Sequence, residues 1–126
     1  MSSLKKGIYY YSAADHTLTS ISSIEPGTNM SELLCGQDFA TALPFGIFMT
    51  SRFDMLWKKY PHSRAYRIAL LDVGHLSQTF QLTATALGLQ PWLSGAFCDE
   101  KINTLLKLNA LSEQTLCFVG AGYSHS

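Results

Sequence analysis

The sequence predicts an α+β domain in which a small, mainly antiparallel sheet packs against one long central helix. β-prone runs occupy both ends of the chain, and a helical pattern continues without a break from Arg64 to Leu87. A second, amphipathic helix is predicted from Asp99 to Leu108. At 126 residues the chain has the length of one domain, so we expect residues 1–126 to fold as a single unit.

The N-terminal part predicts a β-hairpin. Gly7 to Ser12 reads GIYYYS, and a second β-prone run extends from His16 to Ile24. The turn sequence Glu25-Pro26-Gly27 ends this second run. Thr28 or Asn29 can then cap a short helix.

The middle of the chain predicts a buried strand followed by a short helix. The run from Phe39 to Met49 is apolar throughout, and its later part, from about Phe45 to Thr50, is typical of a buried strand. A helical start before Pro44 is the alternative. Apolar residues recur at helical spacing from Arg52 to Trp57, which indicates a short helix there.

The long helix from Arg64 to Leu87 is apolar on nearly every side, which predicts that it is buried in the centre of the fold. His75 within it is then expected to be a hydrogen-bonded core residue. Gly88 ends the helix. We expect a turn over Leu93 to Phe97 and a final strand within Leu111 to Tyr123.

The composition limits the classes of partner. Hydrophobic residues make up 47% and charged residues 14%, which predicts an apolar interface with a partner chain or a second copy. Nine basic and nine acidic residues cancel, so nucleic-acid binding is not expected. Apolar runs are too short to span a membrane, which favours a cytoplasmic protein.

The cysteines do not form a recognisable site. Cys35, Cys98 and Cys117 are widely spaced and include no CxxC pair, so neither a disulfide framework nor a metal site is expected. We interpret them as small core residues in a reducing compartment.

Two groups of polar residues could carry chemistry. Lys59 could act as a general base if burial or nearby cations favour its neutral form, and Tyr60 could orient or relay a proton. Arg64 begins a basic and aromatic cluster able to hold a carboxylate, a phosphate or the polar rim of a planar ring. The alternative is an ordinary surface pair and an arginine that reaches solvent.

The turn Leu93-Ser94-Gly95-Ala96 is a third candidate. Its glycine lets the backbone approach a flat ligand closely, and its N–H groups can donate hydrogen bonds. No glycine-rich phosphate loop and no nucleophile elbow occur.

Taken in order, these motifs resemble a known family. KYPHSRAYRIALLDVGHLSQTFQLTATALGL and WLSGAFCDEKINTLLKL resemble the C-terminal portion of the SagB-type (ThcOx) dehydrogenases, in the FMN-dependent nitroreductase superfamily. GIYYYSAADHTL resembles the N-terminal hairpin of the same portion. The resemblance covers nearly the whole chain and implies a partial, nitroreductase-like domain.

This resemblance implies an oxidoreductase with FMN in a cleft at a homodimer interface. Characterised members oxidise thiazoline or oxazoline rings in peptides to azoles, which implies a peptide substrate. Lys59 and Tyr60 match the family pair implicated in removing the ring proton. Ser94 and Gly95, followed by Ala96, match the turn that faces the reactive edge of the flavin.

The sequence also departs from the family pattern. Thr79 replaces an asparagine, Pro61 replaces a glycine, and no Arg-Arg-Ser-x-Arg segment is present to bind the FMN phosphate. We therefore expect a missing N-terminal part, a partner chain or another copy to supply that site. The alternatives are a truncated, non-catalytic remnant or scaffold that retains the dimerisation helix, and a small α/β protein that binds another planar ligand.

Overall fold

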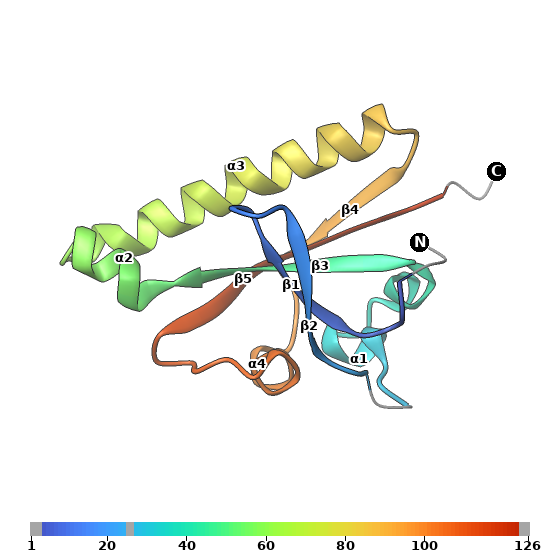
Figure 1. Cartoon of the computed structure of the whole chain (residues 1–126), viewed down its shortest axis with the longest axis horizontal. Helices are drawn as coiled ribbons and strands as arrows, with labels where there is room; N and C mark the ends of the chain where they lie inside the picture. Colours follow the sequence, from blue (N-terminus) through green and yellow to red (C-terminus); the bar gives the residue numbers. More distant parts are fainter. Residues whose placement is uncertain (1–3, 25–26, 124–126) are drawn as a thin grey trace.

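The computed structural model describes residues 4–24 and 27–123. A three-stranded antiparallel sheet forms the body, in the order β3 (Phe45–Arg52), β5 (Glu113–Gly122), β4 (Gln90–Ser94). The long helix α3 (Arg64–Ala86) lies along one face of this sheet (Figure 1). The predicted α+β class and mainly antiparallel sheet are confirmed.

The core is divided between the two faces of β5, because successive side chains of a strand point to opposite sides. Phe118 packs with Leu34 and Ala40 on the face that carries the short N-terminal helices. Cys117 and Val119 face the other way, toward α3. Further apolar side chains complete both clusters: Phe48, Trp92 and Phe97 join the first, and Met49, Val73 and Phe80 join the second.

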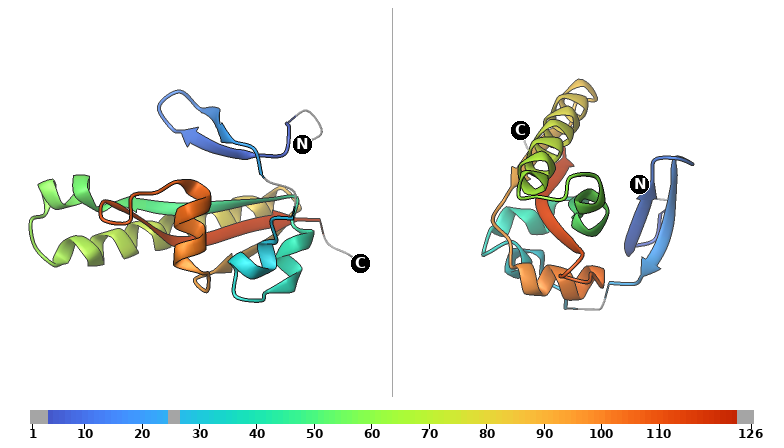
Figure 2. Two further views of the ribbon diagram at one scale, coloured as in Figure 1. Left: turned by 90° about the horizontal axis from the view of Figure 1, so that it is seen from below. Right: turned by 90° about the vertical axis from the view of Figure 1, so that its left-hand side faces the viewer.

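Helix α3 has the predicted bounds to within one residue, but its predicted burial is wrong. Its buried residues form a stripe at intervals of one or two turns: Ala65, Ala69, Ser77 and Ala84. The opposite face carries exposed leucines, of which Leu82 is 63% exposed, and His75 is exposed rather than in the core. A three-stranded sheet covers only one side of a helix, as Figure 2 shows. No helix within the described ranges could span a membrane.

The predicted hairpin is confirmed as β1 (Ile8–Ser12) and β2 (Thr17–Ser22), paired antiparallel. It stands apart from the sheet (Figure 2). Asn29 caps α1 (Met30–Leu33), since its side chain accepts a 2.9 Å hydrogen bond from the Ser31 N–H. Of the predicted turn before this helix, Glu25 and Pro26 lie outside the described residues.

The central part differs from the prediction in burial and length. A 3-10 helix, η1 (Asp38–Ala42), precedes β3, which agrees with the alternative of a helical start before Pro44. Strand β3 reaches Arg52, and Met49 is its one buried residue, because the strand forms an edge of the sheet and leaves Ile47 40% exposed. Helix α2 (Phe53–Lys59) follows as predicted.

Strand β4 was not predicted, because its five residues include Pro91 and show no clear alternation. Leu93 and Ser94 therefore end a strand, and the predicted turn begins only after them. Helix α4 (Asp99–Leu106) is two residues shorter than predicted. It stops because Lys107 adopts a left-handed conformation with φ 56°.

The side chain of Phe118 is 1% exposed, and its ring occupies the space that a side chain on Gly46 would need. A Cβ on Gly46 would overlap the Phe118 ring, whereas a Cβ on Gly74 would have no neighbour within 4 Å. We predict that Gly46→Ala lowers the free energy of unfolding by about 1–3 kcal/mol. Gly74→Ala, in the exposed part of α3, should raise it by up to about 1 kcal/mol. Urea unfolding of both variants measures this, and equal midpoints would contradict the packing described.

The cysteines were predicted to be core residues, but only Cys117 is buried, while Cys35 is exposed and Cys98 is half-buried. Burial raises the pKa of the Cys117 thiol, so less thiolate forms at a given pH. In the native protein we expect a maleimide to label Cys35 first and Cys117 last. Mass spectrometry of timed samples checks this order, which should disappear in denaturant. Early labelling of Cys117 would count against the fold.

Candidate functional site

Lys59 and Tyr60 lie at the C-terminal end of α2. The Tyr60 N–H donates to the Leu56 carbonyl at 2.9 Å and so closes the last turn of the helix. Lys59 is exposed, and its Nζ lies 5.4 Å from the centre of the Tyr60 ring, within range of a cation–π contact. The pair is therefore brought together, but the burial that would favour a neutral lysine is not provided by this chain alone.

Arg64 is the first residue of α3 and its side chain is exposed. The preceding loop is held by His62, whose Nδ1 accepts a hydrogen bond from the Arg64 N–H at 3.2 Å. Tyr66 stacks on Phe53 with ring centres 5.7 Å apart, which fixes α3 against α2. The predicted basic and aromatic cluster thus borders the Lys59-Tyr60 pair.

The Ser94 to Ala96 turn is the most ordered of the predicted sites. Ser94 is 6% exposed, and its Oγ accepts a hydrogen bond from the Ala96 N–H at 3.0 Å. The Gln37 side chain crosses from the loop after α1, where its Nε2 donates to the Ala96 carbonyl at 2.9 Å. Gln37 was not identified from the sequence, because nothing in a single polar residue within a loop indicates a contact 59 positions away.

Gly95 presents an open stretch of backbone. It is exposed, and a Cβ placed on it would meet nothing within 4 Å. In the part of the chain that the structure describes, no hydrogen bond uses the Gly95 N–H, whereas the Ala96 N–H is already paired. The turn can therefore accept the edge of a flat ligand such as a flavin, with Gly95 as the available donor.

Among the described residues, no arginine belongs to the elements beside this turn. The sequence contains only three arginines, Arg52, Arg64 and Arg67, and all belong to the corner around α2 and the start of α3. The turn fits the ring of FMN, but the arginines fit its phosphate only if they come from another copy or another polypeptide.

The two halves of the predicted site are separated along β5. Arg52, just before α2, pairs with Glu113, whereas Ser94 pairs with Phe118. Five residues of strand correspond to about 17 Å. The helix that carries Lys59 therefore leaves the sheet at a point distant from the end of β4, where the Ser94 turn begins.

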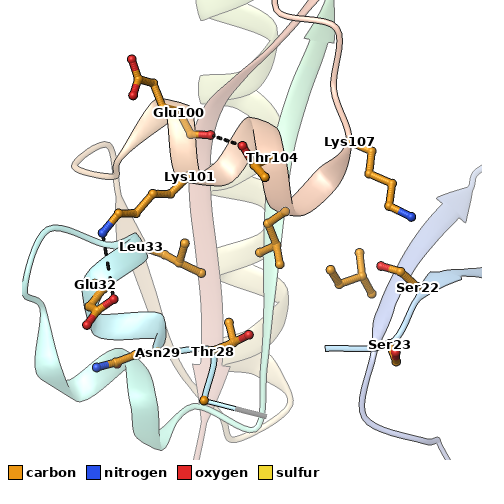
Figure 3. A pocket seen from close by; sticks show the side chains of 13 residues that line it. Ser22, Ser23, Thr28, Asn29, Glu32, Leu33, Glu100, Lys101, Thr104 and Lys107 are labelled. Carbon is orange, nitrogen blue, oxygen red and sulfur yellow. Dashed lines mark hydrogen bonds and ion pairs between the residues drawn. The ribbon is translucent and has the colours of Figure 1, made fainter. Parts of the chain in front are cut away.

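A cleft in the described residues lies elsewhere, between the hairpin, α1 and α4, with a volume of about 740 Å³ (Figure 3). Lys101 and Glu32 approach across it with 4.0 Å between Nζ and Oε2, and Lys107 faces Ser22 from the opposite side. None of the predicted site residues lines it. The cleft is therefore separate from the turn that could hold a flavin.

Comparison with known proteins gives one family. The model of the nitroreductase family matches residues 4–123. TfxC, a trifolitoxin operon protein of Rhizobium leguminosarum bv. trifolii, is 30% identical over 120 residues, which cover 95% of this chain and 33% of TfxC. This chain spans about half or less of the length of the curated relatives that it matches.

Solved structures have the same fold. A protein of Anabaena variabilis classed with the nitroreductases superimposes with a TM-score of 0.86 at 28% identity, over 94% of this chain and 24% of that chain. A chain of the E. coli microcin synthetase McbBCD complex, bound to truncated pro-MccB17, gives a TM-score of 0.84 at 20% identity, over 94% and 44% of the two chains. The nitroreductase-like fold expected from the sequence is confirmed.

Proposed function

Because the chain belongs to the nitroreductase family, we propose that it forms the catalytic portion of a SagB-type, FMN-dependent oxidoreductase. The observation that carries this proposal is the Ser94 to Ala96 turn, where an open glycine lies beside a buried, hydrogen-bonded serine. The ordered motifs that resemble the SagB-type dehydrogenases support the finer assignment.

The proposed substrate is an azoline ring in a peptide, which is oxidised to an azole. The match to TfxC, which is named for a toxin operon, supports a role in the maturation of such a peptide. The microcin synthetase neighbour supports the fold of this branch.

The chain's own residues have separate roles in this reaction. FMN, when bound, supplies the two-electron acceptor. Lys59 Nζ, as the neutral amine, would accept the proton that leaves the ring carbon, and the Tyr60 ring would stabilise the ammonium that forms. The Gly95 N–H donates to the electron-rich edge of the cofactor.

This mechanism requires the site to be completed by another chain, because Lys59 and the Ser94 turn are distant within one copy. The outward side of α3 is the proposed contact, since the helix and its C-cap leave large apolar side chains exposed: Leu70, Leu71, Leu76, Leu82 and Leu87. We propose a homodimer formed through this face. A partner chain that supplies the FMN phosphate site is the alternative arrangement.

We predict that Lys59→Ala lowers the rate of azoline oxidation by about 10²–10⁴-fold, because a general base is lost. The thermal midpoint should hardly change, since Lys59 is exposed. Lys58→Ala, at the neighbouring exposed position, is the control and should retain activity. The measurement is mass-spectrometric detection of the two-hydrogen loss from an azoline peptide, with FMN and any adjacent-gene partner present.

Failure of every such assembly to bind FMN, or full activity of Lys59→Ala, would exclude this proposal. Failure to bind FMN would favour the alternative of a non-catalytic remnant or scaffold, and full activity of Lys59→Ala would do so only if the partner chain alone retains that activity. One observation supports that alternative: Thr79 stands where the family has an asparagine, and its hydroxyl bonds to the His75 carbonyl at 2.9 Å.

The proposed dimer contact can be tested separately. The double substitution Leu71→Glu and Leu82→Glu places charges on the apolar face of α3 and should convert a dimer into a monomer at micromolar concentration. Ala14→Glu, in the exposed hairpin turn, is the control and should leave the dimer intact. Sedimentation velocity measures both. A wild-type monomer, or a dimer unaffected by the double substitution, would count against this interface.

A further inference from the structure

Gln37 joins two segments that are far apart in the sequence. Its Nε2 donates to the Leu34 carbonyl at 2.7 Å and to the Ala96 carbonyl at 2.9 Å. It also lies 3.0 Å from the Ser94 Oγ. The side chain therefore connects the end of α1 with the turn after β4.

The donors and acceptors of this cluster fix the orientation of the Gln37 amide, while the Ser94 hydroxyl has two acceptors at 3.3 Å, Gln37 Oε1 and the Ala96 carbonyl. Carbonyl oxygens only accept, so the two hydrogens on Nε2 go to Leu34 and Ala96, which fixes the orientation of the amide. The Ser94 hydroxyl, which accepts from the Ala96 N–H, can then donate to Gln37 Oε1 at 3.3 Å. Both the N–H and the carbonyl of Ala96 are thereby held, and the turn is left with little freedom to rotate.

The other end of the connection is rigid. Leu34 is fully buried and packs against Phe118, and the Cys98 N–H donates to the Leu33 carbonyl at 2.8 Å. Gln37 therefore ties the turn to a segment that is held in the core through Leu34. Gly95 lies between two held residues, and in the described part of the chain its N–H makes no hydrogen bond.

We propose that Gln37 is a positioning residue that sets the geometry of the cofactor-facing turn. The expected effect on FMN rests on the proposed function. The expected effect on the turn itself does not depend on it. Preorganised donors stabilise charge on a ligand only while their direction is fixed, and removal of the amide would free the Ala96 carbonyl to turn. Gln37 acts through the turn and does not need to touch the cofactor.

The test compares Gln37→Met, which keeps the length of the side chain but loses its hydrogen bonds, with Gln90→Met, an exposed glutamine at the other end of β4. Amide hydrogen exchange should become about tenfold faster at Ala96 in Gln37→Met and stay unchanged in the control. In the FMN complex, Gln37→Met should also shift the flavin midpoint potential to a more negative value, because the reduced ring loses a directed donor. The control should leave this potential unchanged.

Two results would overturn the inference: unchanged exchange at Ala96 in Gln37→Met, or faster exchange there with the same flavin potential as the wild type. Faster exchange over the whole core would also overturn it, because Gln37 would then serve general stability. If the wild type binds no FMN in any assembly, the proposed function fails. Exchange at Ala96 then decides by itself whether Gln37 holds the turn.

Discussion

The packing of β5 is the constraint on which the rest of the structure depends. It is the middle strand, and both of its neighbours in the sheet, β3 and β4, are placed by pairing with it. Its side chains also divide the core, with Phe118 on one face and Val119 on the other. The corner that carries Lys59 and the turn that carries Gly95 are therefore positioned by different parts of one strand. The spacing of the candidate site follows from the register of this sheet.

Periodicity predicted those elements whose stability depends on their own residues. The bounds of α3, the hairpin and the final strand follow from local patterns, since each has a long repeat or a strong terminating residue such as Gly88. Strand β4 is short and is stabilised by its pairing with β5, so its own residues did not predict it. The burial of α3 was overestimated because an apolar pattern does not distinguish a face that meets the same chain from a face that meets another.

The candidate site was predictable to a similar extent. Gly95 was identified because a glycine in a turn lets the backbone approach a ligand closely, and Lys59 because it belongs to an ordered series of motifs. Gln37 could not be found in this way. Its contacts depend on the approach of α1 to the end of β4, which is a property of the tertiary fold.

The order of the strands along the chain has a consequence for biosynthesis. Strands β3 and β4 are made before β5, yet in the described residues each finds its hydrogen-bonded neighbour only in β5. While the ribosome is still adding residues before 113, the sheet cannot form, and two strand edges stay open to other nascent chains. Formation of this sheet therefore waits until β5 has been made, whatever the chain has formed before it.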